Sequence, residues 1–275
     1  MEQKLFILPE DKFLNMDNLG KIRYWEVGNR SKPAIVFLHG IGSAVESWLA
    51  QIEFLSKYFY LTAIDIPGFG KSYLYNNNYD LVSILSVLDL FVQKKEIENL
   101  AIIGHSLGGF LALEFTNAHP SRIDKLVLIA SGGFGMPSKR FRFLGSHISQ
   151  LLFLPFVKTD FLGPKIFRYF YGNGLPVLAY QELSKHWENS TVVDSFVRVL
   201  RESDKHKFAN VSCIICPTLI IWGSKDWVLN YRNSFVAKTK LPNSEVRILD
   251  GFSHGAHTET PEEINPIILG FLTSS

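Results

Sequence analysis

The sequence predicts an α/β protein: a mostly parallel central sheet with helices on both faces, and a helical lid insertion. Two observations support this prediction. Short apolar runs alternate with helix-like segments along most of the chain, which is the order that strand–helix–strand units produce. The 275 residues are also 47% hydrophobic and 20% charged, so the chain can bury a large core.

Short runs rich in Val, Ile, Leu and aromatic residues are predicted to be strands, because buried parallel strands are short and apolar throughout. They are residues 22–27, 34–39, 61–66, 100–105, 125–130, 218–222 and 245–249. The first run has mixed polarity, which predicts an edge strand. The segments between these runs have helical patterns. They are residues 46–57, 80–95, 109–118, 231–240 and 261–273, the last with proline at its start.

The alternation breaks between residues 132 and 212. No strand pattern follows the run ending at residue 130, and this stretch holds 10 of the 22 phenylalanines, with 11 basic and 6 acidic residues. Such a shift in composition indicates an insertion with its own role. We therefore expect residues 1–131 and 213–275 to form the core domain, and residues 132–212 to form a helical lid over the carboxyl edge of the sheet.

Charge and segment composition exclude several classes of protein. The formal net charge of +2 lacks the basic excess of a nucleic-acid-binding protein. No stretch approaches the roughly 18 apolar residues of a transmembrane helix. Residues 1–11 show no secretory signal, and there are two cysteines, Cys213 and Cys216. The expected protein is cytoplasmic, a monomer or dimer, with at most weak contact between its lid and a membrane surface.

The strongest motif is Gly104-His105-Ser106-Leu107-Gly108, between a predicted strand and a predicted helix. A G-x-S-x-G sequence in this context is typical of a nucleophile elbow, a sharp turn that exposes a reactive serine. The turn strains Ser106 and needs small neighbours, which Gly104 and Gly108 supply. The positive end of the following helix would favour a developing oxyanion.

A serine hydroxyl needs a base, and the base needs an orienting carboxylate. In this architecture the order along the chain is serine, acid, histidine. His254 follows the last predicted strand in a loop that can reach Ser106, and His257 lies nearer a helix. Asp226 follows a strand at the same edge, whereas Asp250 is too close to His254 in sequence to reach around its ring easily. We therefore predict Ser106, Asp226 and His254 as the catalytic residues.

Five motifs in this order resemble the α/β-hydrolase superfamily, specifically its lid-bearing serine hydrolases, which include esterases, lipases and carbon–carbon bond hydrolases. They are His39-Gly40-Ile41-Gly42, Asp65-Ile66-Pro67-Gly68-Phe69-Gly70-Lys71-Ser72, the elbow, Trp222-Gly223 through Asp226, and Gly251 through His254 with Glu259 and Pro261. The resemblance implies an oxyanion hole made by the backbone N–H groups of Ile41 and Leu107. It also implies that no cofactor is required.

Three other motifs do not support the binding site or reaction that each might suggest. Gly70-Lys71-Ser72 lacks the upstream glycine of a phosphate-binding loop, because that position is Asp65. Cys213 and Cys216 have redox spacing but precede a buried strand, which favours ordinary buried thiols. His254, His257 and Glu259 could suggest a metal, yet His254 already has a role beside Ser106, so no metal site is expected.

The predicted function is cleavage of carboxylic esters with hydrophobic acyl groups. The lid is rich in aromatic residues, and we expect Phe134, Phe141 and Phe170 to contact the substrate. One alternative is a carbon–carbon bond hydrolase of dienoate ring-cleavage products, although Gly255 stands where that group often has Trp. Another is a non-catalytic ligand receptor on the same fold.

Overall fold

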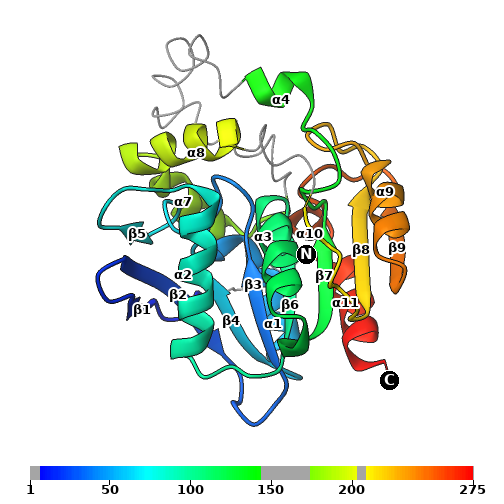
Figure 1. Cartoon of the computed structure of the whole chain (residues 1–275), viewed down its shortest axis with the longest axis horizontal. Coiled ribbons are helices and arrows are strands. Elements are labelled where there is room, and N and C mark those ends of the chain that lie inside the picture. The colour runs from blue at the N-terminus through cyan, green and yellow to red at the C-terminus, as the bar shows by residue number, and fades with distance from the viewer. Residues whose placement is uncertain (1–6, 144–173, 203–208, 275) are drawn as a thin grey trace.

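The computed structural model describes residues 7–143, 174–202 and 209–274, and in these ranges nine strands form one sheet (Figure 1). The order is β1-β2-β4-β3-β6-β7-β8-β9, and β5 also pairs with β2. Neighbouring strands from β4 to β9 in this order are parallel, whereas β2 is antiparallel to β1, β4 and β5. The strands are β1 (Lys12–Asn15), β2 (Gly20–Val27), β3 (Ala34–Leu38), β4 (Tyr60–Ile64), β5 (Tyr73–Leu74), β6 (Leu100–His105), β7 (Ile123–Ile129), β8 (Thr218–Gly223) and β9 (Ser244–Leu249).

Helices cover both faces of this sheet, as the alternation predicts. In β3, Ile35 and Phe37 belong to the apolar cluster that includes α1 and α11, whereas Val36 and Leu38 belong to the cluster that includes α2 and α3. This period of two is what a pleated strand imposes. The described helices are α1 (Leu49–Leu55), α2 (Leu81–Lys94), α3 (Leu107–Ala118), α4 (Lys139–Phe143), α7 (Val177–His186), α8 (Ser190–Glu202), α9 (Asn233–Lys240), α10 (Ala256–Glu259) and α11 (Pro261–Thr273), with short 3₁₀ helices η1 (Val45–Trp48) and η2 (Pro120–Arg122).

The prediction that residues 22–27 form an edge strand is wrong. They lie in β2, which pairs with β1 on one side and with β4 and β5 along the other. Arg23 contributes to the mixed polarity on which the prediction was based. Its side chain is nevertheless buried, and it forms ion pairs with Glu46 and Asp65. A buried charge with such partners is compatible with an interior strand.

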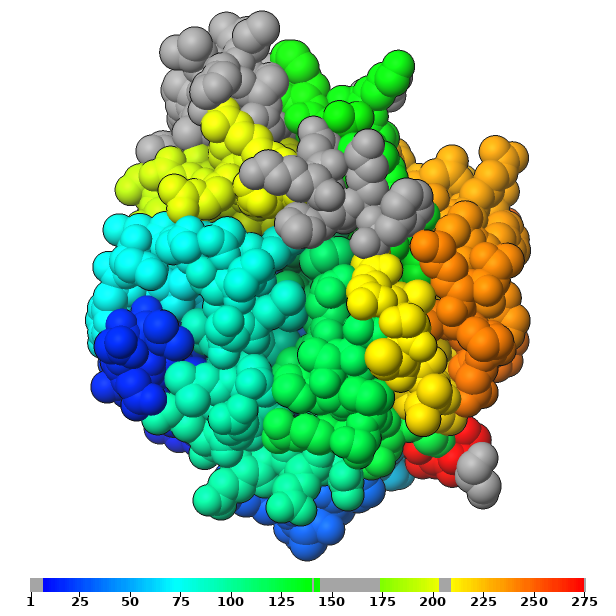
Figure 2. Space-filling model, in the orientation of Figure 1, coloured from blue at the N-terminus to red at the C-terminus, as the bar shows by residue number. Residues whose placement is uncertain are grey.

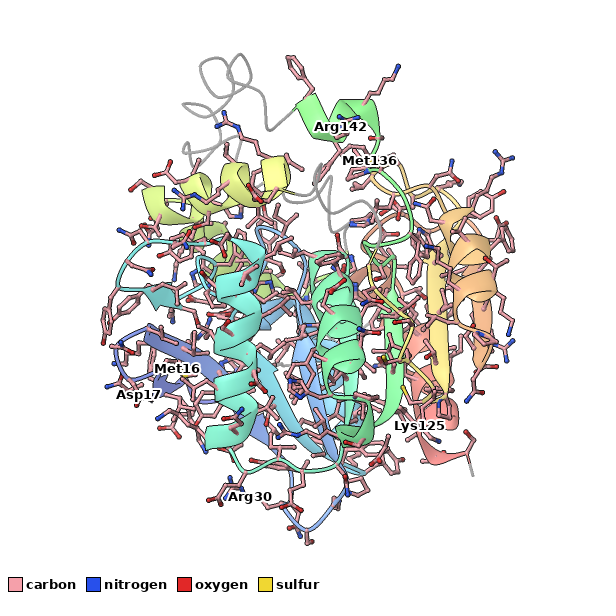
Figure 3. All side chains as sticks on the ribbon, viewed as in Figure 1. Met16, Asp17, Arg30, Lys125, Met136 and Arg142 are labelled. Carbon is pink, nitrogen blue, oxygen red and sulfur yellow. The ribbon has the colours of Figure 1, made fainter. Side chains whose placement is uncertain are left out.

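All parallel strands run toward one end of the molecule. Lys125 near the start of β7 and Arg30 before β3 lie at the end opposite to Met136 and Arg142, which follow β7 (Figure 3). Residues 132–212 lie in sequence between β7 and β8, which are neighbouring strands of the sheet. We call residues 132–212 the insertion; its described helices are α4, α7 and α8.

The α8 helix of the insertion lies directly above the surface formed by α2 (Figure 2). Its apolar face is buried, and Arg198 on its outer side donates a hydrogen bond to the carbonyl of Asn77 at 3.2 Å. An amphipathic helix with one buried face of this kind is expected where it packs on another layer. The α8 helix is therefore packed on the core, and its residues Val199 and Leu200 come close to the turn between β6 and α3.

Candidate active site

Ser106 lies at the sharp turn between β6 and α3, with φ 53° and ψ −112°. A non-glycine residue in this region of backbone space is strained by about 1–3 kcal/mol. The neighbours must be glycine: a Cβ on Gly104 would lie 2.4 Å from the carbonyl oxygen of Gly108, and one on Gly108 would lie 2.0 Å from that of Leu38. This crowding is the physical reason for the two glycines of the motif.

Three side chains far apart in sequence form one chain of hydrogen bonds. His254 Nε2 lies 2.9 Å from Ser106 Oγ, and His254 Nδ1 lies 2.8 Å from Asp226 Oδ2. Ser106 follows β6, Asp226 follows β8 and His254 follows β9, so parallel strand ends bring them to one edge. With Nδ1–H donating to the carboxylate, Nε2 is free to accept the serine proton.

Each oxygen of the Asp226 carboxylate accepts two hydrogen bonds. Its Oδ1 accepts from the backbone N–H groups of Val228 and Leu229, at 2.8 and 2.9 Å, and its Oδ2 accepts from the Trp222 indole at 3.0 Å as well as from His254. The rival carboxylate, Asp250, accepts instead from the Ser224 hydroxyl at the surface. Asp226 is thus the acid that orients His254 in this structure.

The two predicted oxyanion donors adjoin Ser106. Leu107 is the first residue of α3, and both Leu107 and Ile41 line the same cavity as Ser106. In the described part of the chain, neither backbone N–H donates to another protein group. The loop passes tightly over the serine, because a Cβ on Gly40 would lie 3.3 Å from Ser106 Cβ. Two unused N–H groups beside a serine are suited to bind a developing negative charge.

His39 braces this loop. Its Nδ1 donates to the carbonyl of Gly40 at 2.8 Å, and its Nε2 accepts from the N–H of Ile66 at 2.9 Å. This assignment needs a neutral ring, and burial lowers the pKa of His39 accordingly. His39 therefore joins the loop after β3 to the residues after β4 through both of its ring nitrogens.

Two further histidine rings pack behind His254. The sequence analysis considered only His257 of these two as a candidate residue. His105 lies between the other two, with its ring centroid 4.8 Å from that of His254 and 4.4 Å from that of His257. His105 Nε2 also lies 3.0 Å from the carbonyl oxygen of His254. Burial lowers the pKa of His105 and, together with the nearby charge of His254, lowers that of His257 to about 3. Both rings are therefore neutral at physiological pH.

An open cavity with about 580 Å³ of empty space lies beside Ser106. In the part of the chain that the structure describes, its lining carries no charged side chain, and Ser106 supplies the one polar side chain. The other lining residues are Ile41, Leu81, Leu107, Phe110, Gly132, Gly133, Gly135, Pro137, Phe141, Val199, Leu200, Val228 and Leu229. Such a lining suits an apolar group next to the reacting atom.

The predicted substrate-contacting phenylalanines have different positions. Phe141 on α4 lines the cavity. Phe134 is not among the described lining residues, and it is buried in the main apolar cluster, to which Phe141 also belongs. Phe170 lies outside the described residues. Sequence reasoning missed Val199 and Leu200, although the apolar spacing of α8 is a signal that could have found them.

Other candidate chemistry has little support in the described residues. No group of three His, Cys, Asp or Glu side chains there is placed to hold a metal ion. Cys213 is exposed and Cys216 is buried, both are free thiols, and burial raises the pKa of Cys216 to about 11, which makes it unreactive. The same residues contain no helix long and apolar enough to cross a membrane.

Known proteins of the α/β-hydrolase fold are similar to this chain in sequence and structure. Residues 33–147 match the family described as the alpha/beta hydrolase fold. An uncharacterized protein of Mycobacterium tuberculosis is 28% identical over 89% of this chain and 76% of its own length. A monoacylglycerol lipase of Xenopus laevis is 25% identical over the same shares. The chain is thus an α/β-hydrolase-fold protein, which confirms the resemblance stated from its motifs.

The solved structures agree with this fold. A 2-hydroxy-6-oxo-6-phenylhexa-2,4-dienoate hydrolase from Rhodococcus superposes with a TM-score of 0.82 at 20% identity, over 96% of this chain and 99% of that chain. This likeness concerns the fold alone. Together with the lipase relative, the comparisons support a hydrolase.

Proposed function

We propose that this protein is a serine hydrolase that cleaves carboxylic esters with hydrophobic acyl groups. The observation that carries the proposal is the hydrogen-bonded chain Asp226–His254–Ser106 at the edge of an apolar cavity. A serine with a positioned base beside unused backbone N–H groups has the parts that acyl transfer requires.

The mechanism follows from these positions. Ser106 Oγ attacks the ester carbonyl while His254 Nε2 takes its proton, and Asp226 stabilises the imidazolium that forms. The carbonyl oxygen becomes an oxyanion and accepts hydrogen bonds from the N–H groups of Ile41 and Leu107. His254 then gives the proton to the leaving alcohol, which breaks the C–O bond and leaves an acyl-Ser106 ester.

Deacylation uses the same groups in reverse roles. Water loses a proton to His254 Nε2 and attacks the acyl carbon, and the second oxyanion occupies the same two N–H groups. Collapse of this intermediate returns the proton to Ser106 Oγ and releases the carboxylic acid. The sum of the two stages is one ester and one water converted to an alcohol and a carboxylic acid.

The insertion is proposed to act as a cap that shapes the acyl site. Phe141 of α4 and Val199 and Leu200 of α8 line the cavity together with Ser106. Each methylene buried against such a surface contributes about 0.8 kcal/mol of transfer free energy, less the cost of ordering the chain. The apolar lining also favours an ester over a dienoate, whose carboxylate would find no cationic partner among the described lining residues.

A turnover panel tests the proposal. Aryl esters from acetate to octanoate are assayed beside a ring-cleavage dienoate, with Ser106→Ala as the matched inactive control. We expect kcat/KM to rise from acetate to medium-length acyl groups. Faster turnover of the dienoate than of every ester would replace the proposal with carbon–carbon bond hydrolysis. Binding of esters without turnover would indicate a receptor.

A further inference from the structure

The loop that carries the proposed oxyanion donor Ile41 is held from two sides. On the core side, the carbonyl of Gly40 accepts from the N–H of Ser43 at 3.1 Å as well as from His39. Because a trans peptide directs its C=O and N–H in opposite directions, these bonds also aim the N–H of Ile41. The next residue, Gly42, has φ +72°, a conformation open to glycine and strained for other residues.

On the outer side, the end of α7 contacts the same loop. The indole Nε1 of Trp187 donates to the carbonyl of Gly42 at 2.9 Å. The ring lies directly against the loop, since a Cβ on Gly42 would be 2.5 Å from Trp187 Cζ2. Trp187 is itself supported by Phe196 of α8, with ring centroids 5.2 Å apart. The insertion therefore contributes a hydrogen bond to a glycine that has little conformational preference of its own.

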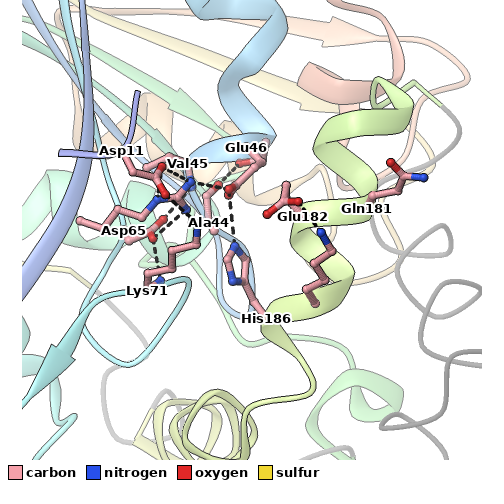
Figure 4. A network of polar contacts seen from close by, with 12 residues as sticks. Asp11, Ala44, Val45, Glu46, Asp65, Lys71, Gln181, Glu182 and His186 are labelled. Carbon is pink, nitrogen blue, oxygen red and sulfur yellow. Dashed lines mark hydrogen bonds and ion pairs between the residues drawn. The ribbon is translucent and has the colours of Figure 1, made fainter. Parts of the chain in front are cut away.

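The preceding residue of α7 contacts the far end of the loop (Figure 4). His186 Nε2 lies 3.5 Å from Glu46 Oε1, and Figure 4 shows the His186 ring directed at that carboxylate. Glu46 is fixed in turn by Arg23 at 2.6 Å, and the N–H of Val45 donates to Asp65 at 2.8 Å. Burial alone would raise the pKa of Glu46, but His186 and Arg23 beside it lower it to about 2. The loop end is thus anchored to the core, and its middle, at Gly42, depends on Trp187.

We propose that Trp187 is a positioning residue for the oxyanion hole. By holding the carbonyl of Gly42, the indole N–H keeps the loop in the conformation that points Ile41 N–H at the substrate oxygen. This inference rests on the proposed serine hydrolase function. Loss of one oxyanion donor typically lowers kcat by about 10²–10³-fold, so partial misalignment of Ile41 should lower it by about 10-fold.

The test removes the N–H and keeps the ring. In the full-length protein, Trp187 is replaced by 3-benzothienylalanine, in which sulfur takes the place of the indole N–H, and in a second variant by Phe. Lys185→Met on the same helix is the matched control, because Lys185 is exposed and pairs with Glu182 on the outer face of α7. The measurements are kcat and KM for an aryl ester, and the Ki of an aryl trifluoromethyl ketone, which forms an oxyanion on addition of the serine hydroxyl.

The expected result is a fall in kcat of about 10-fold for the benzothienyl variant, with KM within about 2-fold and Ki weakened by the same factor as kcat/KM. Lys185→Met should match the wild type. Unchanged kcat and Ki in the benzothienyl variant would overturn the proposal. So would an increase confined to KM, which would make Trp187 a wall of the substrate site. Failure of the wild type itself to cleave the ester would instead refute the proposed function.

Discussion

Two buried polar networks in this protein have opposite designs. In the first, Asp226 and His254 pass a chain of hydrogen bonds to Ser106, whose hydroxyl lines the open cavity. In the second, Arg23 is surrounded: its Nε donates to Asp11, its Nη1 to Asp65 and its Nη2 to Glu46. One network ends at a group that a substrate can reach, whereas in the other the buried Arg23 guanidinium is enclosed by three carboxylates. A buried polar network with an open end is suited to chemistry, whereas a closed one holds elements together.

Substitution at the open end should have the largest effect. Ser106→Ala removes the proposed nucleophile without removing any partner of Asp226, so ester turnover should fall by at least about 10⁴-fold while the unfolding midpoint stays within about 2 °C. Steady-state assays and thermal denaturation measure the two quantities. A fluorophosphonate probe should label the wild type at Ser106 and leave the variant unlabelled; labelling at another serine would contradict the assignment.

A substitution within the open network should act nearly as strongly. Asp226→Asn cannot hold the Nδ1–H tautomer of His254, and we expect kcat to fall by about 10³–10⁴-fold. Asp250→Asn is the matched control, because Asp250 bonds to Ser224 at the surface. Its kcat should stay within about 2-fold of the wild type. If Asp250→Asn were the more damaging change, the acid would be misassigned.

The closed network should respond through stability. Arg23→Met leaves Glu46 and Asp65 buried without their cation, and breaking such a pair costs about 3–5 kcal/mol. Arg30→Met is the control, because Arg30 is exposed and 3.5 Å from Glu26, which predicts a cost below about 1 kcal/mol. Urea unfolding followed by fluorescence gives both free energies. Equal values for the two variants would show that burial does not separate these ion pairs.

The same contrast explains what the sequence could and could not predict. The elbow is a local motif, since the turn at Ser106 leaves no room for a Cβ at Gly104 or Gly108. His254 and Asp226 follow strands that end at the same edge of the sheet. These features can be predicted from the order of strands and motifs along the chain alone. The Arg23 network joins β2, η1 and the residue after β4, and no local pattern signals it, so β2 was misread as an edge strand.

The sequence does not predict which surface each apolar side chain of the insertion contacts, for a related reason. Phe134 and Phe141 are both buried in the main apolar cluster, yet of the two only Phe141 is among the described residues that line the cavity. Their positions depend on how the insertion packs on the core. The contact of Trp187 with Gly42 likewise joins residues 145 positions apart. Patterns of residue type report which side chains are apolar, but not which surface each of them meets.

His257 belongs to neither network and gives the smallest expected effect. Its ring is fully buried between Trp48 and His105, and within the described residues neither ring nitrogen has a hydrogen-bond partner. Burial foremost, and then the charge of His254, lower its pKa in the fold to about 3, against about 6.5 in the unfolded chain. Between about pH 3 and pH 6.5, the unfolded chain therefore binds a proton at His257 that the folded chain does not bind. The stability contributed by this depressed pKa is fully present above pH 6.5 and is lost as pH falls toward 3.

The substitution His257→Phe tests this account, because it keeps an aromatic ring and removes the titration. At pH 7 the free energy of unfolding should change by less than about 1.5 kcal/mol, since the swap nearly conserves volume. Between pH 7 and pH 5 the variant should lose about 2 kcal/mol less than the wild type, because the wild type alone must exclude a proton from His257. His39 and His105, whose pKa values are also lowered by burial, still titrate on unfolding, so some loss should remain in both proteins. Urea titrations at pH 5, 6 and 7 measure the difference, and parallel pH profiles would show that His257 takes up a proton in the folded protein.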